Sequence, residues 1–148
     1  MIEFERLHPD AVLPSRANPG DAGLDLSCVY GFTLEPGRRA AIPTGLAVKI
    51  PSGSAGLVLP RSGLAMRHGI AVVNAPGLID AGYRGEVKVL LLNTDPLNAF
   101  TAMAGERIAQ LVVVRHSSED AVWVDSLDET ERGTGGFGSS GSAPAQPS

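Results

Sequence analysis

The stretch Arg38 to Leu59, RRAAIPTGLAVKIPSGSAGLVL, sets the pattern that runs through most of the chain. It holds three brief runs rich in Ala, Val, Ile and Leu, and segments containing Pro and Gly separate them, as Pro51-Ser52-Gly53 does. Runs this short, bounded by Pro and Gly, are typical of β-strands, because a helix needs a longer periodic segment. The stretch therefore predicts consecutive short strands.

The same punctuation recurs along the chain, which has 18 glycines and 11 prolines. The candidate strands are Ile2–Arg6, Leu24–Tyr30, Arg38–Ile42, Leu46–Ile50, Ala55–Leu59, Ile70–Val73, Glu86–Leu92, Arg107–Val114 and Val122–Val124. Only Ser62–Arg67 has the composition of a helix, and Pro60 before it and His68-Gly69 after it limit its length. We predict an all-β fold of the sandwich, jelly-roll or barrel kind with one short helix.

The chain is long enough for one domain with a sizeable core. We predict a β domain over residues 1–131 and a flexible glycine-rich arm over residues 132–148. The arm reads GTGGFGSSGSAPAQPS from Gly133, and by composition alone it is a disordered tail.

Charge and cysteine content exclude several classes of protein. With 12 Lys and Arg against 16 Asp and Glu, the net charge of −4 argues against a nucleic-acid-coating protein, so a phosphate ligand must be caught locally by a few arginines. The single cysteine, Cys28, cannot form an internal disulfide, and we predict that it is a small buried apolar residue. No secretory signal or apolar span is evident, so we expect a cytoplasmic protein without a membrane partner.

Pro60-Arg61-Ser62-Gly63-Leu64-Ala65 follows an apolar strand and opens the predicted helix. Such a turn offers backbone amides to an anion, and an arginine and a hydroxyl add charge-assisted hydrogen bonds. A phosphate site is one interpretation. The alternative, in which Ser62 merely caps the helix, is at least as well supported by these residues alone.

Gly77-Leu78-Ile79-Asp80-Ala81-Gly82-Tyr83-Arg84-Gly85 places an acid, an aromatic hydroxyl and a guanidinium between two apolar strands. Its glycines would let backbone approach a ligand closely. The alternative is a long turn in which Asp80 and Arg84 form a surface ion pair. The residues favour neither interpretation over the other.

Three further polar positions interrupt apolar runs. Asp25 lies between Leu24 and Leu26, where a carboxylate is unusual in a strand. Binding of a magnesium ion is one explanation, because an ion that also binds substrate phosphates needs only one protein carboxylate. Arg107 and Gln110 in GERIAQL, and Lys88 between two valines, suit either a ligand or a solvated face. The three histidines are isolated and do not suggest a metal site.

Taken together and in order, five segments resemble the motifs of the trimeric dUTP diphosphatase (dUTPase) family. They are DAGLDL, PRSGLA, NAPGLIDAGYRGE, GERIAQL and RGTGGFGSSG, and the resemblance extends from Pro14 to about Gly141. It implies a jelly-roll-like (β-clip) domain assembled as a homotrimer with shared active sites. It also implies Mg²⁺-dependent hydrolysis of dUTP to dUMP and pyrophosphate, which limits uracil in DNA and supplies dUMP for dTMP synthesis.

The resemblance also assigns a role to each matching residue. Asp80 would activate a water for attack on the α-phosphorus, and Asp25 would reach Mg²⁺ through water. The substrate-binding residues would be Arg61, Ser62, Gly63, Asn74, Leu78, Ile79, Tyr83, Lys88, Arg107, Gln110, Arg132, Phe137, Gly138 and Ser139. Among these, Asn74 and the backbone of Leu78 to Asp80 would read uracil, Tyr83 would pack under the deoxyribose, and residues 132–141 would form a lid.

Two alternatives share this fold. One is a dCTP deaminase-type enzyme, against which the Ile79 to Gly85 segment and Phe137 argue. The other is a non-catalytic nucleotide-binding regulator, which would be expected to lack Asp80 or the lid residues.

Overall fold

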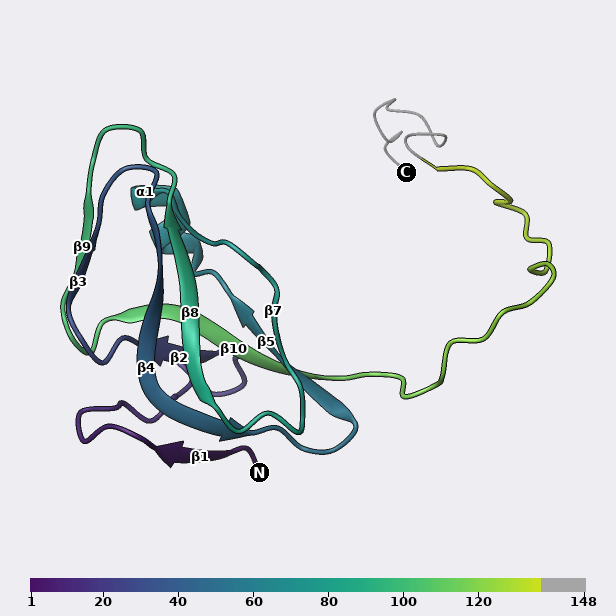
Figure 1. The fold of residues 1–148 in the computed structure, drawn as a ribbon, viewed down its shortest axis with the longest axis horizontal. Coiled ribbons are helices and arrows are strands. Elements are labelled where there is room, and N and C mark those ends of the chain that lie inside the picture. The colour runs from purple at the N-terminus through teal and green to yellow at the C-terminus, as the bar shows by residue number, and fades with distance from the viewer. Residues whose placement is uncertain (137–148) are drawn as a thin grey trace. The chain divides into compact units, whose positions relative to one another are not determined.

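The computed structural model describes residues 1–136, which divide into a compact body, Met1–Ser118, and a second unit beginning at Glu119. The elements of the body, in chain order, are β1 (Glu3–Arg6), β2 (Leu24–Ser27), β3 (Phe32–Leu34), β4 (Arg39–Lys49), β5 (Ser54–Leu59), α1 (Ser62–His68), β6 (Ile70–Val72), β7 (Gly77–Ile79), β8 (Glu86–Asn93), β9 (Phe100–Ala102) and β10 (Arg107–Arg115) (Figure 1). The predicted all-β fold with one short helix is confirmed.

The strands form two four-stranded antiparallel sheets and a small third sheet. One sheet has the order β1-β4-β8-β6, the other has the order β2-β10-β5-β7, and β3 pairs with β9. In Figure 1, β4 and β8 cross in front of β2 and β10, so the two large sheets face each other as layers. β7 is an edge strand, because it pairs with β5 on one side only.

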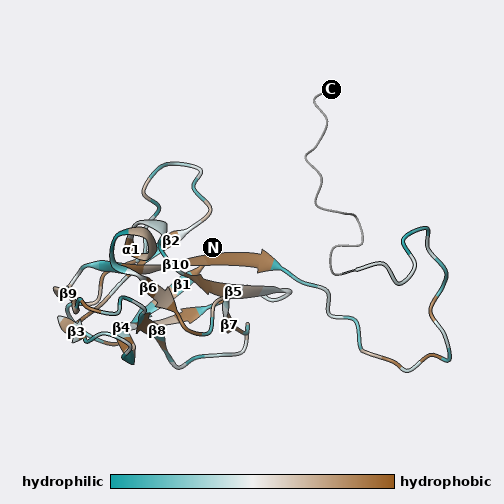
Figure 2. Ribbon diagram, turned by 90° about the horizontal axis from the view of Figure 1, so that it is seen from above, coloured by the Kyte–Doolittle hydropathy of each residue, from teal (hydrophilic) through white to brown (hydrophobic). Residues whose placement is uncertain are grey.

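The core fills the space between the layers, and strand alternation explains which side chains reach it. On β8, Val87, Val89 and Leu91 are buried, whereas the residues between them are partly or fully exposed. Leu26 and Leu111, from the other sheet, are also completely buried. Figure 2 shows the apolar residues concentrated on the strands and the polar ones in the connecting loops. Every member of this core cluster lies within the body.

The helix α1 begins at Ser62, as predicted, and ends at His68, one residue after the predicted end. Gly69 ends it in the left-handed conformation, with φ of 63°, and its N–H donates to the carbonyl oxygen of Ala65. The N-cap residue is Arg61, which has extended backbone and makes no side-chain capping bond. The alternative in which Ser62 serves as an N-cap is therefore wrong.

The main error in the strand predictions concerns β4, which is one strand and not two. Pro43 pairs with Lys88, and the next pairing in register is Ala47 with Glu86, so β4 bulges between them. Thr44 is buried in the bulge and donates from Oγ1 to the carbonyl oxygen of Val87 at 2.6 Å. The Pro and Gly that suggested a turn therefore lie in a bulge that the neighbouring strand stabilises.

Other differences concern short elements. The three-residue strands β3, β7 and β9 were not predicted. The predicted strand Val122–Val124 is wrong, because these residues form no strand and Trp123 between them is fully exposed. None of the helices in residues 1–136 is long and apolar enough to span a membrane.

Candidate active site

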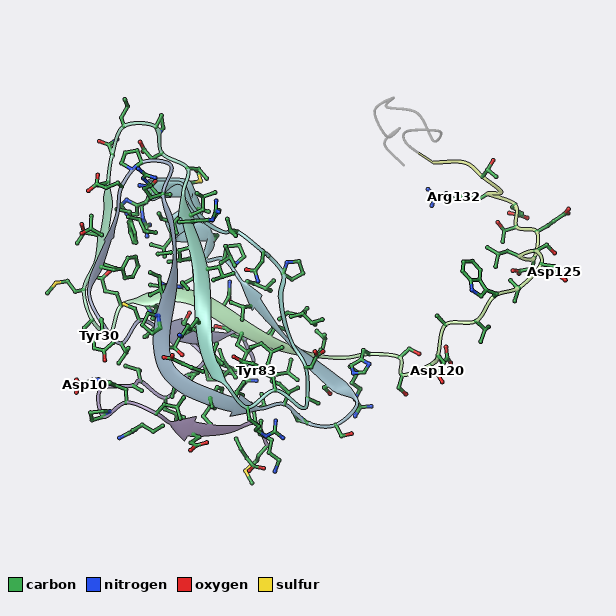
Figure 3. The ribbon with its side chains drawn as sticks, in the orientation of Figure 1. Asp10, Tyr30, Tyr83, Asp120, Asp125 and Arg132 are labelled. Carbon is green, nitrogen blue, oxygen red and sulfur yellow. The ribbon has the colours of Figure 1, made fainter. Side chains whose placement is uncertain are left out.

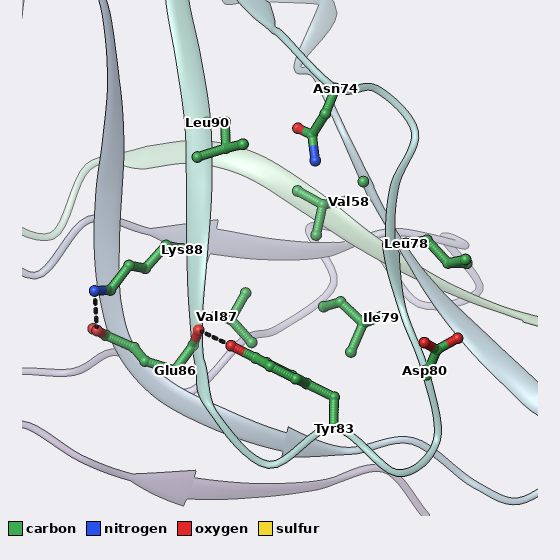
Figure 4. A pocket seen from close by; sticks show the side chains of 11 residues that line it. Val58, Asn74, Leu78, Ile79, Asp80, Tyr83, Glu86, Val87, Lys88 and Leu90 are labelled. Atoms are coloured by element: carbon green, nitrogen blue, oxygen red, sulfur yellow. Dashed lines mark hydrogen bonds and ion pairs between the residues drawn. The ribbon is translucent and has the colours of Figure 1, made fainter.

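A hollow of about 360 Å³ opens between β7, the turn that follows it and the first half of β8 (Figure 4). Six residues that the sequence singled out line it: Asn74, Leu78, Ile79, Asp80, Tyr83 and Lys88. In Figure 4, Leu78 and Asp80 lie on one wall, Lys88 and Leu90 lie on the opposite wall, and the Tyr83 ring crosses the lower end. We call this space the first hollow.

The turn after β7 is held by backbone hydrogen bonds. The N–H of Tyr83 donates to the carbonyl oxygen of Asp80 at 3.0 Å. Nη1 of Arg84 donates to the carbonyl oxygens of Ala81 and Tyr83, both at 2.7 Å. The expected alternative, a surface ion pair between Asp80 and Arg84, is wrong: the guanidinium stabilises the turn, and Asp80 lines the first hollow.

Tyr83 is anchored at its hydroxyl end. The hydroxyl donates to the carbonyl oxygen of Glu86 at 3.0 Å, although the residue as a whole is 46% exposed (Figures 3 and 4). Glu86 is itself fixed, because Oε1 accepts a hydrogen bond from the Gly45 N–H at 3.0 Å and Oε2 lies 3.5 Å from Nζ of Lys88. The bulge in β4 therefore supports the anchor of the Tyr83 ring.

A second hollow of about 440 Å³ lies beside α1 and the adjoining end of β10. Arg61, Ser62, Gly63, Gln110 and Asp25 line it, so the fold brings together residues from three of the five segments that resemble the family motifs. Arg67 lines it as well and was missed. The missed signal was its position four residues after Gly63, which places both residues on one face of the helix.

Asp25 lies between the two arginines of this region. Its Oδ1 is 3.3 Å from Nε of Arg61, its Oδ2 is 3.0 Å from Nη1 of Arg107, and its side chain is only 14% exposed. Nη1 of Arg61 also donates to the carbonyl oxygen of Arg107 at 3.1 Å. A carboxylate in this position fixes the direction of both guanidinium groups.

Gln110 is also held in place. Its Nε2 donates to the carbonyl oxygen of Pro60 at 3.0 Å, which ties β10 to the turn before α1. Its side chain packs against Gly23, where a Cβ atom would come within 2.4 Å of Oε1. Gly23 is therefore a supporting residue that sequence reasoning overlooked.

The described residues include no group of three or more His, Cys, Asp or Glu side chains close enough to hold a metal ion by themselves. A magnesium site would need other ligands. Each Asp25 oxygen lies near one arginine nitrogen, and a carboxylate has about four lone-pair sites, so acceptor capacity remains for the water of a hydrated ion. Asp25 therefore fits an ion that brings its own water and phosphate ligands.

Cys28 is completely buried, and its Sγ donates to the carbonyl oxygen of Met103 at 3.1 Å. Burial raises the pKa of this thiol, since removal from water disfavours the thiolate. Cys28 is a buried residue of the core, as predicted, and is not a nucleophile.

The two hollows touch opposite faces of the sheet β2-β10-β5-β7. Val58 lines the first and the next residue, Leu59, lines the second, and consecutive residues of a strand point to opposite sides. Gln110 pairs with Leu59 and lines the second hollow, whereas Leu111 pairs with Val58 and is buried. The sheet therefore stands between the two hollows of a single chain.

The remaining predicted residues lie elsewhere. Arg107 lines a neighbouring hollow together with Arg61, Arg67 and His68. Arg132 belongs to the second unit, where its Nε donates to the carbonyl oxygen of Gly135 at 2.9 Å (Figure 3). Phe137, Gly138 and Ser139 lie outside the described residues.

Comparisons with known proteins agree on one family. The family model named dUTPase matches residues 10–141. A protein of Rhodococcus erythropolis named deoxyuridine 5′-triphosphate nucleotidohydrolase is 54% identical over 140 residues, covering 95% of this chain and 85% of that protein. One of the same name from Mycolicibacterium gilvum is 55% identical over 141 residues, covering 92% of each.

Solved structures are similar as well. The dUTPase of Staphylococcus bacteriophage 80alpha with dUPNHPP superposes with a TM-score of 0.90 at 31% identity, covering 95% of this chain and 98% of the phage chain. A mutant dUTPase of phage phi11 of S. aureus, described as coordinating a structural Mg(II) ion, has a TM-score of 0.81 at 26% identity and covers 87% of this chain and 99% of that one.

Proposed function

The chain belongs to the dUTPase family and is a deoxyuridine 5′-triphosphate nucleotidohydrolase, and from that premise we propose how its residues bind and cleave the nucleotide. The observation that carries the proposal is the grouping of Asn74, Asp80 and Tyr83 around the first hollow beside an edge strand. The reaction adds water to the α-phosphorus of dUTP, breaks the α–β phosphoanhydride bond, and yields dUMP and pyrophosphate.

Uracil recognition is assigned to β7 and Asn74. One side of β7 is unpaired. Its free backbone N–H and C=O groups can therefore form hydrogen bonds with the acceptors and donor of uracil, as they would with a neighbouring strand. The Asn74 amide adds a donor and an acceptor at the same end of the hollow. Leu78 and Ile79 then supply backbone contacts while the Ile79 side chain belongs to the core.

Asp80 is the proposed general base. Its carboxylate accepts a proton from a water as the water oxygen bonds to the α-phosphorus, and the electron pair of the breaking P–O bond leaves on pyrophosphate. Negative charge develops on the oxygen that bridges the α- and β-phosphorus atoms, and the hydroxyl of Ser62 stabilises it. Arg61 and the Gly63 backbone hold the adjacent phosphates. Arg107 and Gln110 add contacts to the phosphate chain, and Lys88 contributes charge at the first hollow.

Asp25 is proposed to orient Arg61 and Arg107 and to accept a hydrogen bond from a water of the magnesium ion. Magnesium, when bound with the triphosphate, supplies neutralising charge on the phosphate oxygens. The support is the contact of Asp25 with both arginines together with its remaining acceptor capacity.

Replacing Asp25 by Asn is expected to weaken binding of the analogue dUpNHpp roughly three- to tenfold in EDTA, because the arginines lose their shared anionic partner. With Mg²⁺ the loss should be larger, since an acceptor for the water of the ion is weakened too. Isothermal titration calorimetry in both conditions measures this.

The matched control is Asp21→Asn, which changes a carboxylate of the same hollow that bonds to Asn18 and not to an arginine. Unchanged affinity of Asp25→Asn in EDTA would refute the orienting role. Equal losses in the two conditions would refute the link to magnesium.

The active form is proposed to be a homotrimer with shared sites. Asp80 and Arg61 of one chain lie at hollows on opposite faces of a sheet, so one nucleotide cannot use both from the same chain. A threefold ring brings the second hollow of one copy to the first hollow of another through closed heterologous contacts. Arg132, Phe137, Gly138 and Ser139 of the arm would then close over the nucleotide.

Subunit mixing tests this arrangement. Asp80→Asn and Arg61→Ala are each expected to be nearly inactive, but an equal mixture, unfolded and refolded together, should regain about a quarter of wild-type activity, because random assembly completes that share of two-chain sites. Each variant refolded alone is the control. A mixture no more active than its components would contradict shared sites.

The product spectrum separates this function from its rivals. Pyrophosphate should appear on incubation with dUTP and Mg²⁺, and not with dCTP. Ammonia released from dCTP would indicate a deaminase, and binding of dUTP without products would indicate a regulator. We propose that the protein acts in the cytoplasm, where nucleoside triphosphates are made and used.

A further inference from the structure

The turn between β7 and β8 contains a close contact that no assigned role explains. A Cβ atom built on Gly85 would lie 2.4 Å from the Tyr83 hydroxyl oxygen, 2.7 Å from Cζ and 3.1 Å from Cε2. The first two separations are shorter than real Cβ contacts, so the Tyr83 ring rests against the backbone of Gly85 in space that only glycine leaves free.

Glycine is required at position 85 because of the space that the Tyr83 ring occupies, and not because of the backbone conformation of Gly85. Gly85 is not among the glycines with positive φ, so an alanine could adopt its backbone conformation without strain. The conflict instead lies at the hydroxyl end of Tyr83, the end that donates to the carbonyl oxygen of Glu86. A side chain at position 85 would therefore move the ring away from that anchor.

Tyr83 can move without disturbing the core. The residue is 46% exposed and is not part of the buried cluster. Its ring does line the first hollow, however, so a shift of the ring changes the shape of the space where a nucleotide sugar would lie. The effect of a Cβ at position 85 should thus appear in ligand selection and not in folding.

We propose that Gly85 is a positioning residue for sugar selection, which holds the Tyr83 ring where it excludes a 2′-hydroxyl. This inference rests on the proposed function and on the role that the family resemblance gives to Tyr83, packing under the deoxyribose. Gly85 does not line the first hollow and would act through Tyr83.

The test compares kcat/KM for dUTP and for UTP, measured by pyrophosphate release, in the full-length protein. Gly85→Ala is expected to lower the dUTP to UTP ratio by roughly tenfold, since loss of a close steric fit in a pocket has effects of about that size. Its melting temperature should stay close to that of the wild type. The matched control is Gly82→Ala, in the same turn, where a Cβ would meet nothing within 4 Å and φ is not positive.

A double-mutant cycle decides whether Gly85 acts through the ring. In a Tyr83→Ala background, Gly85→Ala should leave the ratio unchanged, because the group it displaces is gone. A further fall in the double variant would overturn the proposal, and so would a Gly85→Ala ratio equal to that of the wild type.

Tyr83→Phe provides a second variant that introduces no clash. It removes the bond to Glu86, so it should lower the ratio in the same direction, and a wild-type ratio would overturn the role of the anchor. Failure of the proposed function gives a different outcome, since the wild-type protein would then release no pyrophosphate from dUTP.

Discussion

Replacing Asp80 by Asn is expected to lower kcat for dUTP by roughly 10² to 10⁴-fold, the range that a lost general base typically produces. The amide is nearly the same size as the carboxylate but cannot accept the proton of the attacking water. Asp80 lines the first hollow and makes no ion pair with Arg84, so the variant should leave the turn intact. Quenched-flow or steady-state pyrophosphate release measures the loss.

Binding separates chemistry from recognition in this variant. Titration with dUpNHpp should give a dissociation constant within a few-fold of the wild type, because Asn74, β7 and the arginines are unchanged. Asp10→Asn is the matched control, since it makes the same chemical change at an exposed position that lines neither hollow (Figure 3). Near-normal turnover by Asp80→Asn would refute its assignment as the base.

Truncation after Arg132 is expected to reduce kcat/KM for dUTP by at least about tenfold to a hundredfold. The family resemblance implies that Phe137 stacks on the uracil and that Gly138 and Ser139 contact the phosphates, and one stacked base is worth about 1 to 3 kcal/mol. Folding should be nearly unaffected, because every core residue lies in Met1–Ser118. Thermal unfolding followed beside activity checks both parts.

A shorter truncation is the control for the arm. Removing residues 142–148 deletes a segment outside the matched region, which ends at residue 141, and should leave turnover unchanged. If the longer truncation also left turnover unchanged, the arm would be a tail without a part in the reaction.

Much of the architecture followed from the sequence, and the failures have physical causes. Strands with buried alternation such as β8 were predicted well because several apolar residues repeat with the period of a strand. β3, β7 and β9 have three residues each, too few for that period to show, and each contains a Thr or a Gly. β6 is equally short but was predicted because Ile70, Ala71 and Val72 are all apolar. Val122–Val124 has the right composition but no hydrogen-bonded partner strand, and composition cannot supply one.

In the candidate site too, some features could be predicted from the sequence and others could not. Leu78, Ile79, Asp80 and Tyr83 line one hollow, and Arg61, Ser62 and Gly63 line the other, because each set is nearly continuous in the sequence. The ion pairs of Asp25 with Arg61 and Arg107, and the contact of Gly85 with Tyr83, depend on how the chain folds back on itself. Nothing in the spacing of these residues reveals them.

The bulge in β4 has a consequence for attempts to make this protein more regular. Between Pro43 and Ala47, β4 carries more residues than the facing step from Lys88 to Glu86 on β8, so a deletion there would give a more ideal ladder. Such a deletion would also remove the Gly45 N–H, which donates a hydrogen bond to the Glu86 carboxylate. The carbonyl oxygen of Glu86 in turn accepts the hydrogen bond from the Tyr83 hydroxyl. We therefore expect a redesign that makes this sheet more regular to weaken the proposed selection between sugars.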